Sequence, residues 1–301
     1  MKKFLTPTAN IAFVAIMSAI NAVIALMTDF IPVMSLFMIL ILPIISALTI
    51  IYCQGKYLSI YYISSCIICF ILNLSSPENI IFSLFPSLIS GSIIGFMIKR
   101  QKNPQMTIIL TTLSQSIFTL ITIPLVNALY QVNMFEVYRT FLKIDSLDVA
   151  NLTFLPLIYV LSLIQSSFTI FICKNELEKL NISYSLNISS TFISSIISII
   201  SLILTIASIY FYEPIVYLFL SISISLGAFS IVRIFTKSSK IGVALIGTSL
   251  LLFVFLFAGL YSSIDKKYLA IIFSVIVLPF TVVDIISALL KKYLTTLKKI
   301  G

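Results

Sequence analysis

Residues 9–27 read ANIAFVAIMSAINAVIALM, a run without a single charged side chain. A helix needs about 20 apolar residues to cross the roughly 30 Å of hydrocarbon in a bilayer. The run is longer than the apolar part of an ordinary signal peptide, and no Ala-x-Ala cleavage site follows it before Asp29. It therefore predicts a retained first transmembrane helix.

Comparable apolar runs recur along the chain as far as residue 290. Of the 301 residues, 60% are hydrophobic and only 10% are charged, whereas a soluble domain carries about 25% charged residues. The sequence therefore predicts an all-α, polytopic membrane protein with about ten transmembrane helices. The expected spans are 9–28, 33–53, 57–73, 79–98, 106–129, 150–173, 188–211, 215–235, 241–263 and 268–290.

The positions of the cations test this assignment, because Lys and Arg accumulate in short cytoplasmic loops. With the N-terminus inside, 15 of the 19 Lys and Arg residues fall in cytoplasmic segments. Both ends of the chain are then cytoplasmic, and the protein is a multi-pass protein of the cell membrane. The net charge of +9 reports this topology, so we expect the lipid bilayer and not nucleic acid as its partner. The inner cations are Lys2, Lys3, Lys56, Lys99, Arg100, Lys102, Lys174, Lys179, Arg233, Lys237, Lys240, Lys291, Lys292, Lys298 and Lys299.

Two loops are longer than a turn and divide the chain. The inner loop, 174–187, is a polar connector between a six-helix block, 1–173, and a four-helix block, 188–301, which ends in a basic tail. The outer loop, about 130–149, repeats apolar residues at helical spacing from Met134 to Leu142. It is typical of a helix that lies flat at the membrane interface, and a lid over an outer cavity is the alternative.

Residues that support enzymatic chemistry are scarce. The chain has no His, its four Cys do not form a metal-binding pattern, and one carboxylate lies inside a span. It also lacks the GxxxxGK[ST] phosphate loop. We therefore expect no enzymatic activity, no cofactor, no metal and no ATP site of its own.

Small residues mark two helix faces. Ala12, Ala15, Ala19 and Ala22 share one face of the first helix, and Gly91 and Gly95 form a GxxxG in the fourth. Such residues let helix backbones approach closely in lipid. They are candidate helix-docking residues, either within this chain or towards another membrane protein.

Polar side chains inside the expected spans are few, and each one needs a partner in hydrocarbon. Gln115, Asn127 and Gln165 are candidate solute contacts because their helices flank the long outer loop, although they could also join helices to one another. Asp284 is the intramembrane charge. It predicts a salt bridge to Lys291 or to Arg233, or else proton or cation coupling.

Several of these features together resemble the YybS-like family of bacterial membrane proteins. They are the Ala15-x-x-x-Ala19 step, the turn Asp29-Phe30-Ile31-Pro32, the Gly91-x-x-x-Gly95 helix ending in Lys99-Arg100, and Asp284 before a basic tail. That family is similar in turn to the substrate-binding S components of energy-coupling-factor vitamin transporters.

The resemblance implies a solute-binding subunit that docks through Ala15 and Ala19 onto a transmembrane coupling subunit with its ATPases. Asp29 to Pro32 would then belong to a gating loop. S components have six helices, whereas about four more follow residue 187 here. The solute is unknown, and a membrane assembly or regulatory protein without a transported solute is the alternative.

Overall fold

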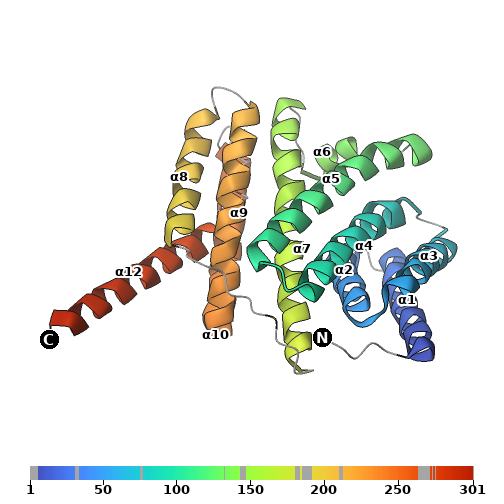
Figure 1. Ribbon diagram of the computed structural model, residues 1–301. Helices are drawn as coiled ribbons and strands as arrows, with labels where there is room; N and C mark the ends of the chain where they lie inside the picture. The colour runs from blue at the N-terminus through green and yellow to red at the C-terminus, as the bar shows by residue number, and fades with distance from the viewer. Residues whose placement is uncertain are drawn as a thin grey trace. The chain divides into compact units, whose positions relative to one another are not determined.

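The computed structural model describes residues 6–30, 34–74, 77–131, 133–142, 147–179, 184, 192–209, 213–263, 272, 274 and 276–300. Within these ranges the chain is all-α, with eleven helices and no strand (Figure 1). The helices are α1 (Pro7–Phe30), α2 (Met34–Tyr52), α3 (Gly55–Leu72), α4 (Pro77–Lys99), α5 (Pro104–Tyr130), α6 (Met134–Leu142), α7 (Leu147–Lys179), α8 (Phe192–Ser208), α9 (Glu213–Lys237), α10 (Ser239–Ser263) and α12 (Leu278–Ile300).

Six stretches of helix are long and apolar enough to cross a membrane, among the residues that the structure describes. They are Pro7–Met27, Gly55–Leu72, Ile80–Lys99, Pro104–Tyr130, Thr153–Lys179 and Ile215–Phe235. Four shorter apolar stretches overlap the other four expected spans, and they are Met38–Tyr52, Ile193–Ser208, Lys240–Ser249 and Leu278–Leu290.

The last helix differs from its expected range of 268–290. α12 begins at Leu278, directly after a turn at residues 276–277, and continues to Ile300. Pro279 explains this start, because proline lacks an amide hydrogen and fits the first turn of a helix better than its interior. Most of residues 264–275 lie outside the described part of the chain.

The expected loops are partly helical. α7 runs past residue 173 to Lys179, so the connector begins as helix. In the outer loop, the helical spacing from Met134 to Leu142 is confirmed as α6. Burial raises the pKa of the Tyr138 hydroxyl in α6, and this hydroxyl donates to Thr153 Oγ1 over 2.5 Å.

The burial pattern of α5 is the reverse of that in a helix of a soluble protein. In α5, seven of the eleven buried residues are Thr, Ser or Gln, whereas Ile117, Ile121 and Leu129 are more than half exposed. Water would favour the opposite arrangement, because apolar burial drives folding there. Polar groups inside and apolar groups outside indicate that lipid surrounds these helices.

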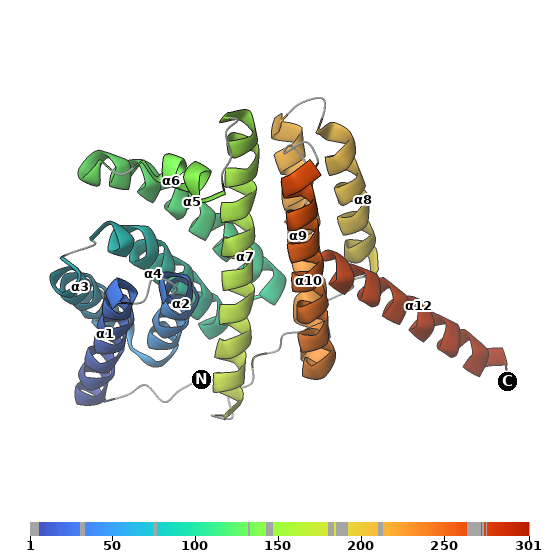
Figure 2. The same ribbon diagram turned by 180° about the vertical axis from the view of Figure 1, so that it is seen from behind.

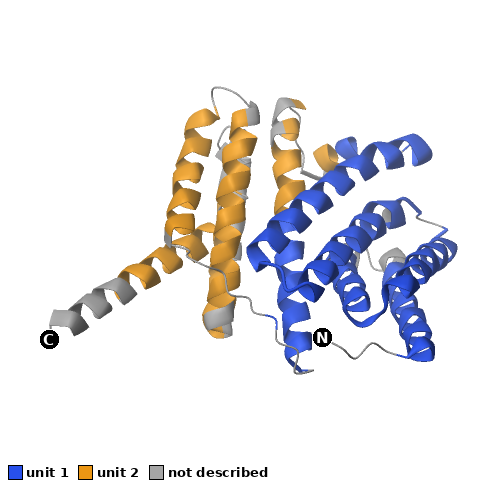
Figure 3. Cartoon of the chain, in the orientation of Figure 1, with its two compact units in different colours: residues 1–137, 162–187 blue, residues 138–161, 188–301 orange. Residues whose placement is uncertain are grey.

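The chain divides into two compact units (Figure 3). Unit 1 contains residues 1–137 and 162–187, and unit 2 contains residues 138–161 and 188–301. α7 contributes residues to both units. The expected blocks 1–173 and 188–301 stay a prediction. Residues 138–161 were expected in the first block, and they belong to unit 2.

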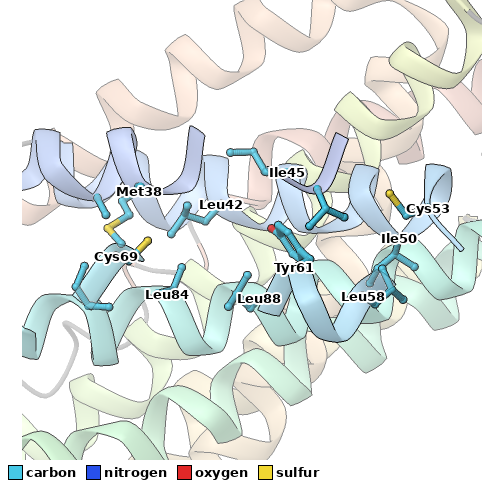
Figure 4. Packing of buried hydrophobic residues seen from close by; sticks show 14 of the residues in the cluster. Met38, Leu42, Ile45, Ile50, Cys53, Leu58, Tyr61, Cys69, Leu84 and Leu88 are labelled. Atoms are coloured by element: carbon cyan, nitrogen blue, oxygen red, sulfur yellow. The ribbon is translucent and has the colours of Figure 1, made fainter. Parts of the chain in front are cut away.

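Unit 1 is built around the pairs α1–α3 and α2–α4, and α5 packs along α4. Figures 1 and 2 both show α1 beside α3. Its apolar core includes Met38, Leu42 and Leu84 together with the ring of Tyr61 (Figure 4). Because Tyr61 is fully buried, its hydroxyl needs partners from the same helices.

Gly91 and Gly95 allow α4 to lie against α2. A Cβ built on Gly95 would stand 2.7 Å from the backbone oxygen of Ala47, and one on Gly91 would stand 2.7 Å from the Cβ of Ser46. These two glycines therefore serve packing within the chain. Ser46 Oγ donates to the Leu88 oxygen over 3.0 Å across the same interface.

Unit 2 contains α8, α9, α10 and α12. Two serines join α8 to α9 reciprocally: Ser198 Oγ donates to the Ser223 oxygen over 2.7 Å, and Ser223 Oγ donates to the Ser198 oxygen over 2.9 Å. Such pairs satisfy hydroxyls that lipid cannot hydrate. They fix how α8 and α9 lie against each other.

Candidate functional site

The alanine face of α1 is mostly exposed. Ala12, Ala15 and Ala19 are exposed, and Ala22 alone is buried, at 3% exposure. The buried face of α1 carries Asn21 and its neighbours instead. Ala22 thus packs within unit 1, and the docking role of Ala12, Ala15 and Ala19 stays a prediction.

The buried face of α1 is polar and joins α1 to α3. Asn21 Nδ2 donates to the Tyr61 hydroxyl over 2.8 Å and to Ser65 Oγ over 3.1 Å. Ser18 Oγ and Ser64 Oγ are 2.7 Å apart. These contacts satisfy most of the polar groups of the α1–α3 interface, so we assign this cluster a structural role.

A second group of polar residues lies in unit 1, and here many atoms lack partners. Gln165 of α7 is 1% exposed, and its Nε2 donates to Ser90 Oγ of α4 over 3.2 Å. Gln115 of α5, which packs along α4, is 4% exposed. Helical neighbours one turn away extend each polar face. We use the name polar seam for six buried polar residues of unit 1, of which Gln165 and Ser90 are joined by this hydrogen bond: Ser87 and Ser90 of α4, Thr111 and Gln115 of α5, and Gln165 and Thr169 of α7.

Five oxygen atoms of the polar seam have no hydrogen-bond partner among the described residues. Leaving a buried polar group unpaired costs about 1–3 kcal/mol, so five of them cost about 5–15 kcal/mol. This cost is as large as the whole stability of a typical domain. Ordered water or a bound molecule can supply such hydrogen bonds. The five atoms are Ser87 Oγ, Thr111 Oγ1, Gln115 Oε1, Gln165 Oε1 and Thr169 Oγ1.

Gln115 and Gln165 thus lie in the same unit, and each carries an unpaired side-chain oxygen. Asn127 differs from them because its side-chain oxygen has a hydrogen-bond partner. Asn127 Oδ1 accepts a hydrogen bond from the backbone N–H of Met134 over 3.0 Å. It caps the start of α6, where the first amides of a helix need acceptors. Its side chain is only half-buried.

Asp284 of α12 is 2% exposed and forms an ion pair with Arg233 of α9, one of the two partners expected from the sequence. Its Oδ2 also accepts from Ser195 Oγ over 2.8 Å and from Ser230 Oγ over 3.4 Å. The side chain of Lys291 lies outside the described residues. The ion pair satisfies the expected pairing, and proton or cation coupling at Asp284 stays a prediction.

The implied gating loop falls mainly outside the described chain. Asp29 and Phe30 end α1, and residues 31–33 are not described. The hydroxyls of the polar seam were not predicted from the sequence. Ser87 and Ser90, like Thr169 four residues after Gln165, have a helical spacing that could have indicated one polar face.

Together these features define an all-α, membrane-embedded protein with a buried polar seam in unit 1 and a buried ion pair in unit 2. Comparisons with family models, with curated proteins and with solved structures found no match.

Proposed function

We propose that this protein is a transport-related, solute-binding membrane subunit of the S-component kind, without an ATP site of its own. The observation that carries the proposal is the set of unpaired oxygens in the polar seam, because a bound polar solute would supply their missing hydrogen bonds. Gln115 and Gln165 are the proposed solute contacts. The resemblance to YybS-like proteins supports the same class of function.

We expect native mass spectrometry of the freshly solubilised protein to show a bound small molecule. A variant with both Gln115→Leu and Gln165→Leu should lose this adduct, because leucine offers no hydrogen-bond acceptor. The control is Gln105→Leu, which removes an amide from the first turn of the same helix, and it should keep the adduct. A wild-type protein that carries no small molecule would contradict solute binding and favour the assembly or regulatory function.

The exposed alanine face supports a second part of the proposal, a protein partner. Close packing between helices in lipid needs small side chains at the contact, and Ala12, Ala15 and Ala19 present such a face on the outside of α1. A transmembrane coupling subunit with its ATPases fits the resemblance. Energy for transport would then come from that complex.

The variant Ala15→Leu with Ala19→Leu is expected to lose co-purification with the coupling subunit while keeping its thermal stability, since both positions are exposed. Recovery of the complex on affinity beads measures the first effect, and a melting curve in detergent measures the second. Ile16→Leu, on the same exposed face, is the control, because it leaves the bulk of the side chain unchanged. Full recovery of the complex with the double variant would rule out this docking face.

We further propose that ten segments cross the cell membrane and that both termini are cytoplasmic. The cation distribution supports this topology, because 15 of the 19 Lys and Arg residues then face the cytoplasm. Reporter fusions after Lys102 and after Ser238 should both report a cytoplasmic position. An outer position at either residue would contradict the proposed topology.

A further inference from the structure

Two turns of unit 1, one between α2 and α3 and one between α4 and α5, are joined by Lys99. The ammonium group of Lys99, the last residue of α4, donates to the backbone oxygen of Ile50 over 2.9 Å and to that of Cys53 over 3.0 Å. Both oxygens belong to the end of α2, where carbonyls lack partners within the helix. α3 begins just after Cys53, at Gly55, and α5 begins at Pro104. The two turns therefore lie at the same end of unit 1.

The backbone of the turn between α4 and α5 is fixed by hydrogen bonds. Gln101 has a φ of 52°, in the left-handed region, and its N–H donates to the Ile98 oxygen over 2.9 Å. The N–H of Lys102 donates to the Met97 oxygen over 2.9 Å. These two bonds form the Schellman arrangement that ends many helices. The buried hydroxyl of Tyr184 also donates to the Lys102 oxygen, over 3.1 Å. The turn is therefore held both by α4 and by Tyr184.

The long side chains at these two turns are cationic and reach solvent or lipid headgroups. Lys56 is exposed at the start of α3, and Arg100 and Lys102 are exposed in the turn after α4. None of these three residues forms an ion pair within the described part of the chain. Lys56 Nζ lies 5.0 Å from the ring centroid of Tyr57, which leaves its charge uncompensated. Three exposed positive charges are thus gathered on two joined turns.

Acidic side chains do not offset this charge. α2, α3 and α5 contain no Asp or Glu, and Glu78 of α4 lies at the opposite end of its helix. Near the end of α7, Glu176 is paired with Lys179, and Glu178 is paired with Lys174. The N-termini of α3 and α5 add positive potential, because the helix dipole is positive at that end. This end of unit 1 therefore attracts anions.

The basic residues lie at the depth of the lipid headgroups. Of the apolar stretches that can cross a membrane, Gly55–Leu72 and Pro104–Tyr130 begin at these turns, and Ile80–Lys99 ends there. Hydrocarbon ends where such stretches end, and long basic side chains there extend towards the headgroups. Each Lys or Arg near an anionic membrane surface strengthens the association about fivefold. Lipid phosphates are therefore the anions within closest reach of these turns.

We infer that the two turns form a surface that binds the headgroups of anionic phospholipids, through Lys56, Arg100 and Lys102. Lys99 acts as a positioning residue, because it holds the two turns together. This inference goes beyond the proposed solute binding and does not depend on it. An acidic surface of a partner protein is the competing occupant, and the depth of the three cations favours the lipid.

The test is native mass spectrometry of the purified, delipidated full chain in detergent. The protein is mixed with equal amounts of phosphatidylglycerol and phosphatidylcholine that carry the same acyl chains, so that the net charge of the headgroup is what distinguishes them. We expect the wild-type protein to retain phosphatidylglycerol in preference to phosphatidylcholine. Lys102→Gln should lower this preference about fivefold, because it removes one cation from the surface. Removing Lys56 and Arg100 in the same way should lower it further.

The matched control is Lys240→Gln, which removes one exposed lysine of α10 in unit 2 and should leave the preference within about twofold of the wild type. Lys102→Arg keeps the charge and should keep the preference. The Lys102 side chain is exposed, and its backbone oxygen still accepts from Tyr184 in both variants, so their Tm without lipid should equal that of the wild type. This measurement separates a loss of binding from a loss of folding.

Two outcomes overturn the inference. Equal retention of the two lipids by the wild-type protein would leave these cations to an acidic protein surface. An equal loss of preference in Lys102→Gln and Lys240→Gln would show a general attraction between a basic protein and anionic lipid, without a defined surface. A lower preference in Lys102→Gln alone, restored in Lys102→Arg, supports the proposed surface.

Discussion

Asp284→Leu is expected to lower the free energy of unfolding by about 3–5 kcal/mol, because it leaves the charge of Arg233 buried without its carboxylate. Arg233→Met should also destabilise the fold, since Asp284 is 2% exposed and would lose its counter-ion. Denaturant or thermal unfolding in detergent measures both losses.

The double variant, Arg233→Met with Asp284→Leu, distinguishes an ion pair from two independent contacts. It should recover most of the stability, because apolar side chains in place of a buried pair are often neutral or stabilising. Ser195 and Ser230 would still bond to each other over 3.0 Å. The control is Lys240→Met, which removes an exposed cation of α10 and should change stability by less than about 0.5 kcal/mol. Additive losses in the double variant would contradict the pairing.

The helices were largely predictable because hydrocarbon imposes a simple rule on sequence. An apolar run of about 20 residues is required for each crossing, and polar turn residues must separate the runs. α3, expected at 57–73, is found at Gly55–Leu72, and α10, expected at 241–263, is found at Ser239–Ser263. α12 departs from the rule because Pro279 favours a helix start within the apolar run.

Which face of each helix is buried was harder to predict. In a soluble protein the apolar face points inward, whereas the exposed face of α1 is apolar and its packed face carries Ser18 and Asn21 beside Val14. The polar residues of α1 indicate which face is buried, because Ser18 and Asn21 need hydrogen-bond partners and find them in α3. The alanines therefore point outward, although small residues are also common inside helix interfaces.

The polar seam was predictable only in part. Gln115 and Gln165 are rare amides in apolar runs and stand out in the sequence. Thr111 and Thr169 do not, because most Ser and Thr side chains in helices bond to a carbonyl of their own helix, as Ser116 does with Thr112. That Thr111 and Thr169 lack such a bond depends on the packed helices and is visible only in three dimensions.

Gly91→Leu is expected to destabilise the fold by at least about 1–3 kcal/mol, because α4 lies directly on the backbone of α2 at this residue. A Cβ at Gly91 would clash with the backbone oxygen of Pro43 and would stand 2.7 Å from the Cβ of Ser46. A backbone oxygen cannot rotate away as the end of a side chain can. The two helices must therefore separate, which also weakens the hydrogen bond from Ser46 to Leu88.

The matched control is Gly247→Leu in α10, where a Cβ would meet no atom within 4 Å. Both substitutions replace a glycine inside a helix, so both gain about 0.5–1 kcal/mol of helix propensity. The difference in Tm between the two variants therefore isolates the contact between α2 and α4. Equal melting temperatures would contradict this helix pairing, whereas a lower Tm for Gly91→Leu alone supports a core in which glycine is required for α4 to reach α2.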